Sequence, residues 1–348
     1  LQALRDSPAP VLAVDIPSGL QADTGTFTPE LIAGSAQRTV AGSLFHAQNT
    51  LTLLTLKPGL FTASGRDAAG TVWFDDLGAD LSNAAASAWL AGAPASVPRH
   101  HASHKGSYGD VAVIGGALGM AGAALLAASA ALHSGAGRVF ACLLDGSAGL
   151  ASTQPELMLR APESLDLATM AVVCGCGGGT AVRALLPKVL STAASLVLDA
   201  DALNAIATAP SLQTLLRQRA QRGAATVLTP HPLEAARLLD TTTATIQADR
   251  LRATQQLADS YQCTVVLKGS GSIVATPGSL PHINPTGNAQ LATAGTGDVL
   301  AGMVGAALAA GRPAPDAALT AVWHHGTLAD QWPAKKPLTA SKLAQSGY

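Results

Sequence analysis

The sequence contains few charged and few aromatic residues. Only 12% of the 348 residues are charged and 3% are aromatic, whereas 48% are hydrophobic. Disordered chains have high charge and low hydrophobicity, so we expect a compact fold with a large core, long enough for two domains. The formal net charge is -1. Because the chain has no basic surplus, we expect no nucleic-acid partner.

Cysteine is also scarce. Cys142, Cys174, Cys176 and Cys263 each lie in or beside an apolar segment of a chain far larger than a disulfide scaffold. This pattern predicts a reducing compartment, the cytoplasm. Cys174 and Cys176 could form half of a zinc site, but no second pair of ligands stands at a suitable spacing, so buried thiols are favoured.

The sequence has no long hydrophobic run that requires a membrane. No residue between Val111 and His133 is charged, as in a transmembrane helix. Gly115, Gly116 and Gly119 interrupt this segment, which favours a buried strand, a glycine turn and a buried helix. We therefore expect no membrane partner. The chain begins with Leu1 rather than Met, so a missing signal peptide excludes little.

Strand and helix patterns alternate regularly from about residue 104. Expected strands cover 111–114, 137–143, 171–174, 195–198, 225–228, 264–267 and 272–275, and expected helices cover about 119–134, 181–191, 232–239, 244–260, 297–310 and 314–330. This alternation implies a mainly parallel sheet with helices on both faces. Ligands bind such sheets beyond the carboxyl ends of the strands.

The first part of the chain has a different pattern. Residues 1–80 contain apolar runs at 11–16 and 51–56, without enough helices to cover them. Residues 81–103 are rich in Ala, Ser and Pro and show no clear strand pattern. We interpret 81–103 as a linker between a domain at 1–80 and a domain at 104–348.

Five glycine-rich or polar clusters each follow a separate expected strand. They occupy 115–122, 174–180, 199–204, 229–234 and 268–272. Each has a structural explanation when taken singly. His231, for example, lies between two prolines and could simply form a rigid helix entry. Five such clusters at five strand ends favour a binding site.

The segment NPTGNAQLATAGTGDVLAGM, at 284–303, suggests phosphoryl chemistry. Free N–H groups at a helix start, approached through glycine, bind phosphate oxygens, so residues 294–297 form a candidate phosphate cradle. Asp298 follows this cradle and could be either a favourable first-turn acid or the base that takes a proton from an attacking hydroxyl. Lys268 opens a second candidate anion site, with a surface lysine in a turn as the alternative. The chain lacks the P-loop motif.

Seven segments, in the order of the family, resemble the ADP-dependent NAD(P)H-hydrate dehydratases. They are 104–116, 119–139, 154–158, 197–204, 229–239, 265–269 and 284–302. The resemblance implies an α/β fold, a ribokinase-like α/β/α sandwich with a mainly parallel central sheet. It also implies repair of NADH or NADPH whose nicotinamide ring has added water at carbon 6. In this reaction ADP phosphorylates the added hydroxyl and phosphate then leaves, giving NAD(P)H, AMP and phosphate.

The resemblance assigns roles position by position. Asp298 would be the base towards the hydrate hydroxyl. The anion hole would comprise Gly295, Thr296 and Gly297. The AMP moiety would bind Lys268, Gly269, Ser270, Gly271, Ser272 and Gly297, and the NAD(P)H hydrate would bind Ala123, Gly177 or Gly179, His231 and Asp298. ADP is the implied co-substrate, with ATP as the alternative and Mg²⁺ as the accompanying ion, and a homo-oligomer, such as a tetramer, is the implied assembly.

Two stretches depart from the family pattern. The family usually has Pro-Gly-Met where this chain has Ala289-Gln290-Leu291, which affects the loop before the anion hole. It usually has Gly-Pro-Gly-Leu-Gly where this chain has Gly-Cys-Gly-Gly-Gly at 175–179. The second departure leaves the choice between Gly177 and Gly179 open.

Residues 1–80 resemble the C-terminal half of an NAD(P)H-hydrate epimerase domain, an incomplete Rossmann-like α/β remnant. The matching segments are 11–25, 51–60 and 65–78. The resemblance implies that Asp15 contacts the hydrate and that Ser18 helps bind K⁺, although Asp15 alone could be a turn-forming acid. The N-terminal half of that domain is absent, so we expect that this polypeptide does not epimerise the hydrate by itself.

Two other functions remain open. A ribokinase-like kinase for a vitamin precursor alcohol would share the fold and the Gly-Thr-Gly-Asp sequence but release a phosphorylated product. A nucleotide-binding protein without catalysis would have the same glycine-rich loops but would not turn over a substrate. The NPTGN and PHPLE sequences favour the dehydratase.

Overall fold

The computed structural model describes residues 9–27, 45–95, 98–146 and 154–347. Residues 1–8 and 28–44 of the expected first domain, and 96–97 of the expected linker, lie outside this part. The larger body is built on ten strands: β4 (Trp89–Leu90), β5 (Asp110–Gly115), β6 (Arg138–Leu143), β7 (Met158–Leu159), β8 (Ala171–Cys174), β9 (Ser195–Leu198), β10 (Thr226–Leu228), β11 (Thr264–Leu267), β12 (Ile273–Ala275) and β13 (His282–Ile283).

These strands form one sheet in the order β4-β13-β12-β11-β10-β9-β8-β5-β6-β7. Every neighbouring pair from β11 to β7 is parallel, and β12 is antiparallel to both of its neighbours. The central strands are apolar because both faces are covered, and Val111 to Ile114 have no exposed surface. The mainly parallel sheet expected from the sequence is confirmed.

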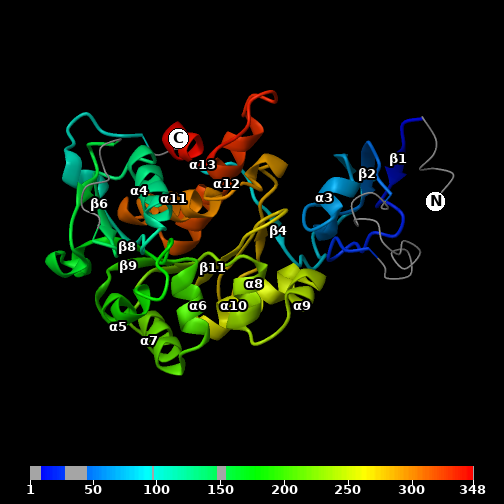
Figure 1. Cartoon of the computed structure of the whole chain (residues 1–348). Coiled ribbons are helices and arrows are strands. Elements are labelled where there is room, and N and C mark those ends of the chain that lie inside the picture. Colours follow the sequence, from blue (N-terminus) through cyan, green and yellow to red (C-terminus); the bar gives the residue numbers. More distant parts are fainter. Residues whose placement is uncertain (1–8, 28–44, 96–97, 147–153, 348) are drawn as a thin grey trace.

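Helices cover the two faces of this sheet (Figure 1). One layer contains α4 (Ala121–His133), α11 (Thr296–Ala309), α12 (Ala314–Asp330) and α13 (Ala340–Ser346). The other contains α5 (Val182–Thr192), α6 (Asp201–Ala207), α7 (Pro210–Gln221), α8 (Pro232–Leu238), α9 (Thr243–Ala248) and α10 (Arg250–Tyr261). This arrangement is the α/β/α sandwich of the expected fold class.

Small residues allow α4 and α11 to pack closely. A Cβ added at Gly302 would lie only 2.0 Å from the carbonyl oxygen of Ala127, so a larger residue there would force the helices apart. This packing explains why the two helices are rich in alanine and glycine.

A smaller unit stands beside this body (Figure 1). Strands β1 (Leu12–Val14), β2 (Asn49–Leu53) and β3 (Thr71–Asp75) pair in parallel in that order. The short 3-10 helix η2 (Pro58–Leu60) and helix α3 (Gly65–Ala68) connect β2 to β3. Its small core contains Leu20, Phe27, Leu60, Ala68 and Ala69.

The structure differs from the sequence-based expectations in several elements. The expected helix 244–260 is two helices, because the Asp249 side chain accepts a hydrogen bond from the N–H of Arg252 and starts a new helix. The expected linker contains β4, whose Trp89 N–H bonds to the carbonyl of Pro281 at the sheet edge. The sequence patterns also missed α6 and α7.

No helix within the described ranges has the length and apolarity needed to cross a membrane.

Candidate functional site

Five neighbouring strands bring the polar clusters together. Strands β11, β10, β9, β8 and β5 are adjacent and parallel. Their carboxyl ends therefore meet at one edge of the sheet, where open α/β sheets bind ligands. The loops that follow these strands contain Lys268, His231, Asp199, Gly177 and Ala117.

Helix α11 begins at this edge. Gly295, its N-cap residue, has φ 90° and ψ −11°, a left-handed conformation that favours glycine. A Cβ at Gly295 would lie 2.6 Å from Leu126 Cδ1. The hydroxyl of Thr296 donates to the carbonyls of Leu291 (2.8 Å) and Thr293 (2.9 Å). Its backbone N–H makes only a long hydrogen bond, 3.4 Å, to the Thr293 carbonyl.

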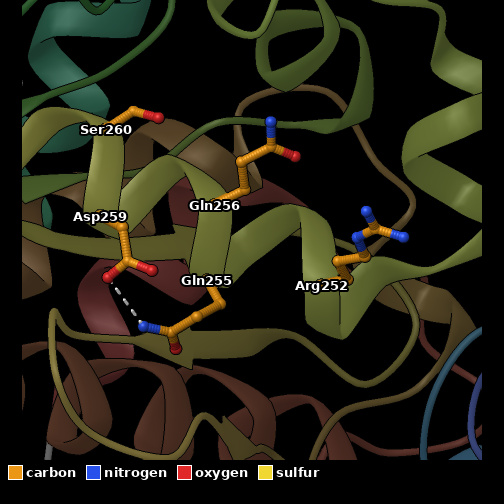
Figure 2. A pocket seen from close by; sticks show the side chains of 5 residues that line it. All are labelled: Arg252, Gln255, Gln256, Asp259 and Ser260. Carbon is orange, nitrogen blue, oxygen red and sulfur yellow. Dashed lines mark hydrogen bonds between the residues drawn. The ribbon is translucent and has the colours of Figure 1, made fainter.

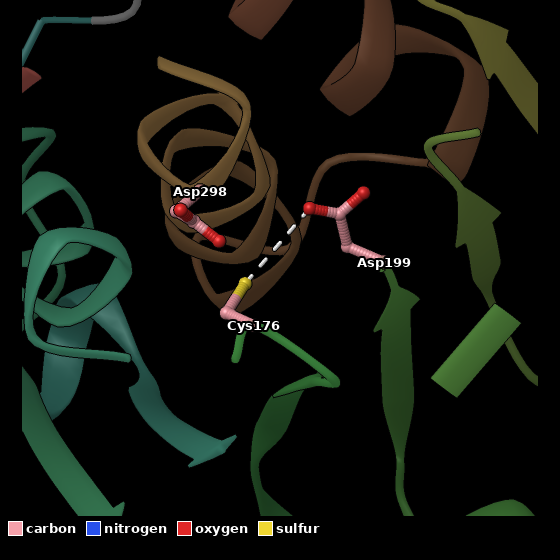
Figure 3. A group of neighbouring side chains, drawn as sticks. All are labelled: Cys176, Asp199 and Asp298. Carbon is pink, nitrogen blue, oxygen red and sulfur yellow. Dashed lines mark hydrogen bonds between the residues drawn. The ribbon is translucent and has the colours of Figure 1, made fainter. Parts of the chain in front are cut away.

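Asp298 lies in the first turn of α11 and is largely buried. Burial, assisted by the charge of Asp199, raises the pKa of Asp298 to about 6. Cys176 and Lys268 partly offset this rise. Figure 3 shows Asp298 and Asp199 near the Cys176 thiol. At neutral pH Asp298 is ionised, yet it is a stronger base than an exposed aspartate, as general-base catalysis requires.

Lys268 is anchored by a buried carboxylate. Its Nζ lies 2.7 Å from Asp199 Oδ1, and the two side chains are 18% and 2% exposed. Thr229 donates a second hydrogen bond to the same oxygen at 2.9 Å. Burial alone would lower the pKa of Lys268, but the charges of Asp199 and Glu234 outweigh it and raise that pKa. Lys268 is therefore a fixed cation, not a surface lysine in a turn.

Glycine brings this cation close to the start of α11. A Cβ added at Gly297 would lie 3.3 Å from Lys268 Nζ. Positive charge and helix N–H groups are thus adjacent, an arrangement that binds phosphate.

A cavity of about 680 Å³ opens beside Lys268 and the α11 start. Its lining residues include seven of the predicted site positions: His231, Lys268, Gly269, Ser270, Ser272, Thr296 and Gly297. The other lining residues are Arg66, Asp67, Asn284, Thr286, Gly287, Asn288, Ala289, Leu291, Ala292, Leu300, Val322, His325 and Gly326. The predicted AMP-binding positions thus gather at this cavity, except Gly271, which packs against the Phe61 carbonyl.

Two of the predicted hydrate-binding positions, Ala123 and Gly177, meet at the neighbouring loop after β8. A Cβ at Gly177 would be 2.7 Å from the Met120 carbonyl and 2.9 Å from Ala123 Cβ, so Gly177 and Ala123 face each other. The N–H of Gly179 instead donates to Asp201 Oδ2 at 2.8 Å. This amide is therefore already occupied by a hydrogen bond within the protein.

His231 caps helix α8 and is itself held in place. Its Nδ1 accepts hydrogen bonds from the N–H groups of Leu233 and Glu234, so the ring proton of the neutral form sits on Nε2. Glu234 accepts from the His231 N–H at 2.7 Å and lies 3.2 Å from Nε2. Burial lowers the pKa of His231 and raises that of Glu234 to about 7. The rigid helix entry and a binding role are therefore compatible.

Sequence reasoning assigned no individual role to His325 and Asn284, which line the cavity. His325 is buried, lines the cavity and donates from Nε2 to the Thr296 carbonyl at 2.9 Å. Burial lowers its pKa to about 4, so it is neutral. Asn284 is buried and donates to the Thr286 carbonyl at 3.0 Å. The NPTGN pattern marked Asn284, but no local signal marked His325.

The departure at Ala289–Leu291 forms the short 3-10 helix η7. Asn288 caps it by accepting a hydrogen bond from the N–H of Gln290 at 3.0 Å. Ala289 and Leu291 line the cavity. The altered residues therefore contribute to the wall of the cavity.

One group of residues in the described part of the chain has the spacing of metal ligands. The ligand atoms of Cys176, Asp199 and Asp298 lie within 4.8 Å of one another. Magnesium prefers oxygen ligands and retains several waters, whereas this group offers a thiol, and Asp199 is already bound by Lys268. The group does not fit a resident Mg²⁺ site.

The two predicted residues of the N-terminal unit lie apart from these loops in the sequence. Asp15, with φ 70°, forms an ion pair with Lys57 and accepts a hydrogen bond from the Leu53 N–H at 3.1 Å. The Lys57 hydrogen bond leads the effects that lower the pKa of Asp15. Ser18 is exposed in the turn after β1. Neither residue lines the large cavity.

A second hollow lies on the outer surface of α10 (Figure 2). Arg252, Gln255, Gln256, Asp259 and Ser260 line it. All five residues belong to one helix, and Gln255 donates to Asp259 at 3.1 Å. The hollow is away from the strand ends and has no feature of a catalytic site.

Comparison with known proteins gives two family matches. A model described as NAD(P)H-hydrate dehydratase matches residues 111–346, and one described as YjeF-related protein N-terminus matches residues 1–59. The "ADP-dependent (S)-NAD(P)H-hydrate dehydratase" of Neisseria meningitidis is 43% identical over 250 residues, 70% of this chain and 83% of that protein.

Longer relatives and a solved structure are also similar. The "Bifunctional NAD(P)H-hydrate repair enzyme Nnr" of Escherichia coli is 38% identical over 344 residues, which cover 93% of this chain but only 61% of that relative. The structure of the ADP/ATP-dependent NAD(P)H-hydrate dehydratase of Bacillus subtilis, co-crystallised with ATP and Mg²⁺, is similar with a TM-score of 0.62 and 31% identity. The similarity covers 71% of this chain and 90% of that one.

Proposed function

Because this chain belongs to the NAD(P)H-hydrate dehydratase family, we propose that it restores NADH or NADPH from the 6S hydrate, using ADP or ATP as phosphoryl donor. The observation that carries the proposal is the placement of Asp298 directly after a glycine-rich helix start, with Lys268 beside that start. A base and an anion-binding cradle are thereby placed at one sheet edge. This combination suits phosphoryl transfer to an alcohol.

The reaction then proceeds in two stages. Asp298 takes the proton of the hydrate hydroxyl as its oxygen attacks the terminal phosphorus of ADP, and AMP leaves. The new phosphate ester is a better leaving group than hydroxide. The lone pair of the ring nitrogen expels phosphate from carbon 6, and loss of a proton from the adjacent ring carbon restores the double bond.

We propose a division of the site between the two substrates. Lys268 to Ser272 and Gly297 contact the AMP moiety, and the N–H groups at Gly295 to Gly297 stabilise the transferred phosphoryl oxygens. Ala123, Gly177, His231 and Asp298 contact the hydrate, and Gly179 supports the loop through Asp201. Mg²⁺ would enter with the nucleotide phosphates and neutralise their charge.

The N-terminal unit and the assembly are the subject of further proposals. In the N-terminal unit, Asp15 is proposed to contact the hydrate and Ser18 to help bind K⁺. We also propose a homo-oligomer, for example a tetramer, in the cytoplasm.

The decisive experiment incubates the protein with NADH hydrate and ADP, with ATP in parallel, and follows the absorbance of restored NADH. A sample without nucleotide is the control. Nucleotide-dependent recovery with release of AMP and phosphate is expected. Nucleotide consumption without recovery would favour a small-molecule kinase, and binding without consumption would favour a non-catalytic protein; either result would contradict the dehydratase.

A further inference from the structure

One corner of the N-terminal unit forms part of the large cavity. Arg66 and Asp67 of α3 line it together with Lys268, Ser270 and residues of the α11 start. Neither family match includes residues 62–67. The cavity is therefore built from both units of the chain.

Arg66 binds the backbone of the NPTGN loop. Its Nη2 donates to the carbonyl oxygens of Pro285 at 2.9 Å and Gly287 at 2.7 Å, and Nη1 lies 3.5 Å from that of Thr286. On the other side of this loop, Asp330 accepts from the Gly287 N–H at 2.8 Å. Arginine can hold several carbonyls at once because its donors have a fixed planar arrangement.

The same corner also holds the loop after β11. Thr62 Oγ1 lies 3.2 Å from the Ser270 carbonyl and 3.3 Å from that of Gly271. Ser270 returns a hydrogen bond from its hydroxyl to the Ala63 carbonyl at 2.8 Å. A Cβ added at Gly271 would lie 1.9 Å from the Phe61 carbonyl. The loop and the corner are thus in direct backbone contact, which only glycine permits.

A buried arginine completes this contact. Arg250 is 1% exposed and donates from Nε to Thr62 Oγ1 at 3.1 Å. Its Nη2 donates to the carbonyls of Leu267 and Lys268 at 3.3 and 3.2 Å. Thr62 is therefore connected through one side chain to the backbone of Lys268.

We propose that residues 62–67 form the outer wall of the nucleotide pocket, and that Arg66 is a positioning residue for binding of a nucleoside diphosphate. The proposal rests on the proposed function, because it takes the cavity beside Lys268 as the nucleotide site. Arg66 holds the 284–288 loop and Thr62 holds the 268–272 loop, so the corner sets the width between them. The N-terminal unit thus serves the dehydratase reaction independently of any activity of its own.

The test measures ADP affinity in the full chain by calorimetry. Arg66→Ala should raise the ADP Kd about tenfold, Arg66→Lys should give an intermediate value, and Thr62→Val should raise it several-fold. Arg160→Ala is the matched control, because Arg160 is exposed and its guanidinium donates to the neighbouring Leu159 carbonyl. Its ADP Kd should equal that of the unchanged protein.

Steady-state kinetics separate positioning from general damage. Arg66→Ala should raise the KM for ADP while kcat and the KM for the hydrate change less than about twofold, because the loop positions only the nucleotide. A variant that merely lowers the folded fraction would reduce kcat with the KM for ADP unchanged, and that result would overturn the proposal. Unchanged ADP Kd values in Arg66→Lys and Thr62→Val would overturn it even if Arg66→Ala did not fold.

The two proposals fail in distinguishable ways. If the unchanged protein binds ADP without restoring NADH, the dehydratase function fails, and the ADP Kd values of the variants still decide the role of Arg66. If the unchanged protein restores NADH and all variants bind ADP normally, only the present inference fails.

Discussion

Lys268 Nζ lies 2.7 Å from Asp199 Oδ1, and the two residues directly follow strands β11 and β9 on either side of β10. The pair fixes a cation beside the α11 start and places a carboxylate near Asp298. The two charges of the pair have opposite effects on Asp298, because Asp199 raises the Asp298 pKa and Lys268 lowers it. The pair therefore connects the cation beside the α11 start with the basicity of Asp298.

Replacing Lys268 with methionine should destabilise the protein. The change leaves the Asp199 carboxylate buried without its cation, which costs about 3–5 kcal/mol in comparable buried pairs. The free energy of unfolding, measured by urea denaturation, should fall by about this amount. The Lys268→Met, Asp199→Asn double variant should recover much of the lost stability. Lys335→Met alters an exposed lysine and should have little effect. A single variant as stable as the unchanged protein would contradict a desolvated pair.

Asp298→Asn should remove turnover while keeping nucleotide binding. An amide cannot accept the hydroxyl proton, so NADH recovery should fall about 100- to 10,000-fold, and the ADP Kd should change little. Asp316→Asn is a matched control, because Asp316 is an exposed first-turn acid of α12. If Asp298→Asn retained full turnover, Asp298 would be only a helix-start acid.

The activity should depend on pH through Asp298. The base must be ionised, and its pKa is raised to about 6, so kcat/KM for the hydrate should rise with pH through about this value. Asp199→Asn removes a negative neighbour and frees the Lys268 charge. Both effects favour ionised Asp298, so the acid limb should move to lower pH. An acid limb that stayed in place would show that another group controls it.

Glu234→Gln should change how stability depends on pH. Burial raises the folded-state pKa of Glu234 from the usual 4.5 to about 7. The folded state therefore binds this proton more tightly than the unfolded state does. The resulting contribution to stability is fully present below about pH 4.5 and is lost as the pH rises through about 7. The loss is on the order of 3 kcal/mol at most.

Urea denaturation at several pH values tests this expectation. Glutamine can still accept the hydrogen bond from the His231 N–H but does not titrate. The free energy of unfolding of the Glu234→Gln variant should therefore fall less between pH 4.5 and 7 than that of the unchanged protein. Glu163→Gln, at an exposed site, should follow the unchanged protein. Parallel pH curves for Glu234→Gln and the unchanged protein would contradict a buried, titrating Glu234.

Much of the architecture follows from local patterns in the sequence. Apolar strands such as 171–174 and 195–198 were predicted at their observed bounds because a strand buried on both faces is a short continuous apolar run. The 244–260 helix was predicted as one element because its apolar period continues across Asp249, whereas the capping bond of that side chain divides it. Strand β4 was missed because two residues carry no periodicity, and pairing with β13 alone defines them.

The sequence by itself determined which loops follow the buried strands and that Asp298 follows a glycine-rich helix start, since glycine spacing and the succession of elements along the chain are local features. The tertiary structure decided which groups meet. Lys268 pairs with Asp199, His325 bonds to Thr296, and Arg66 reaches the NPTGN loop across more than 200 positions of the chain. These contacts depend on sheet order and on packing between two units, and charges and hydrogen bonds act over ångströms in space whatever their separation in sequence.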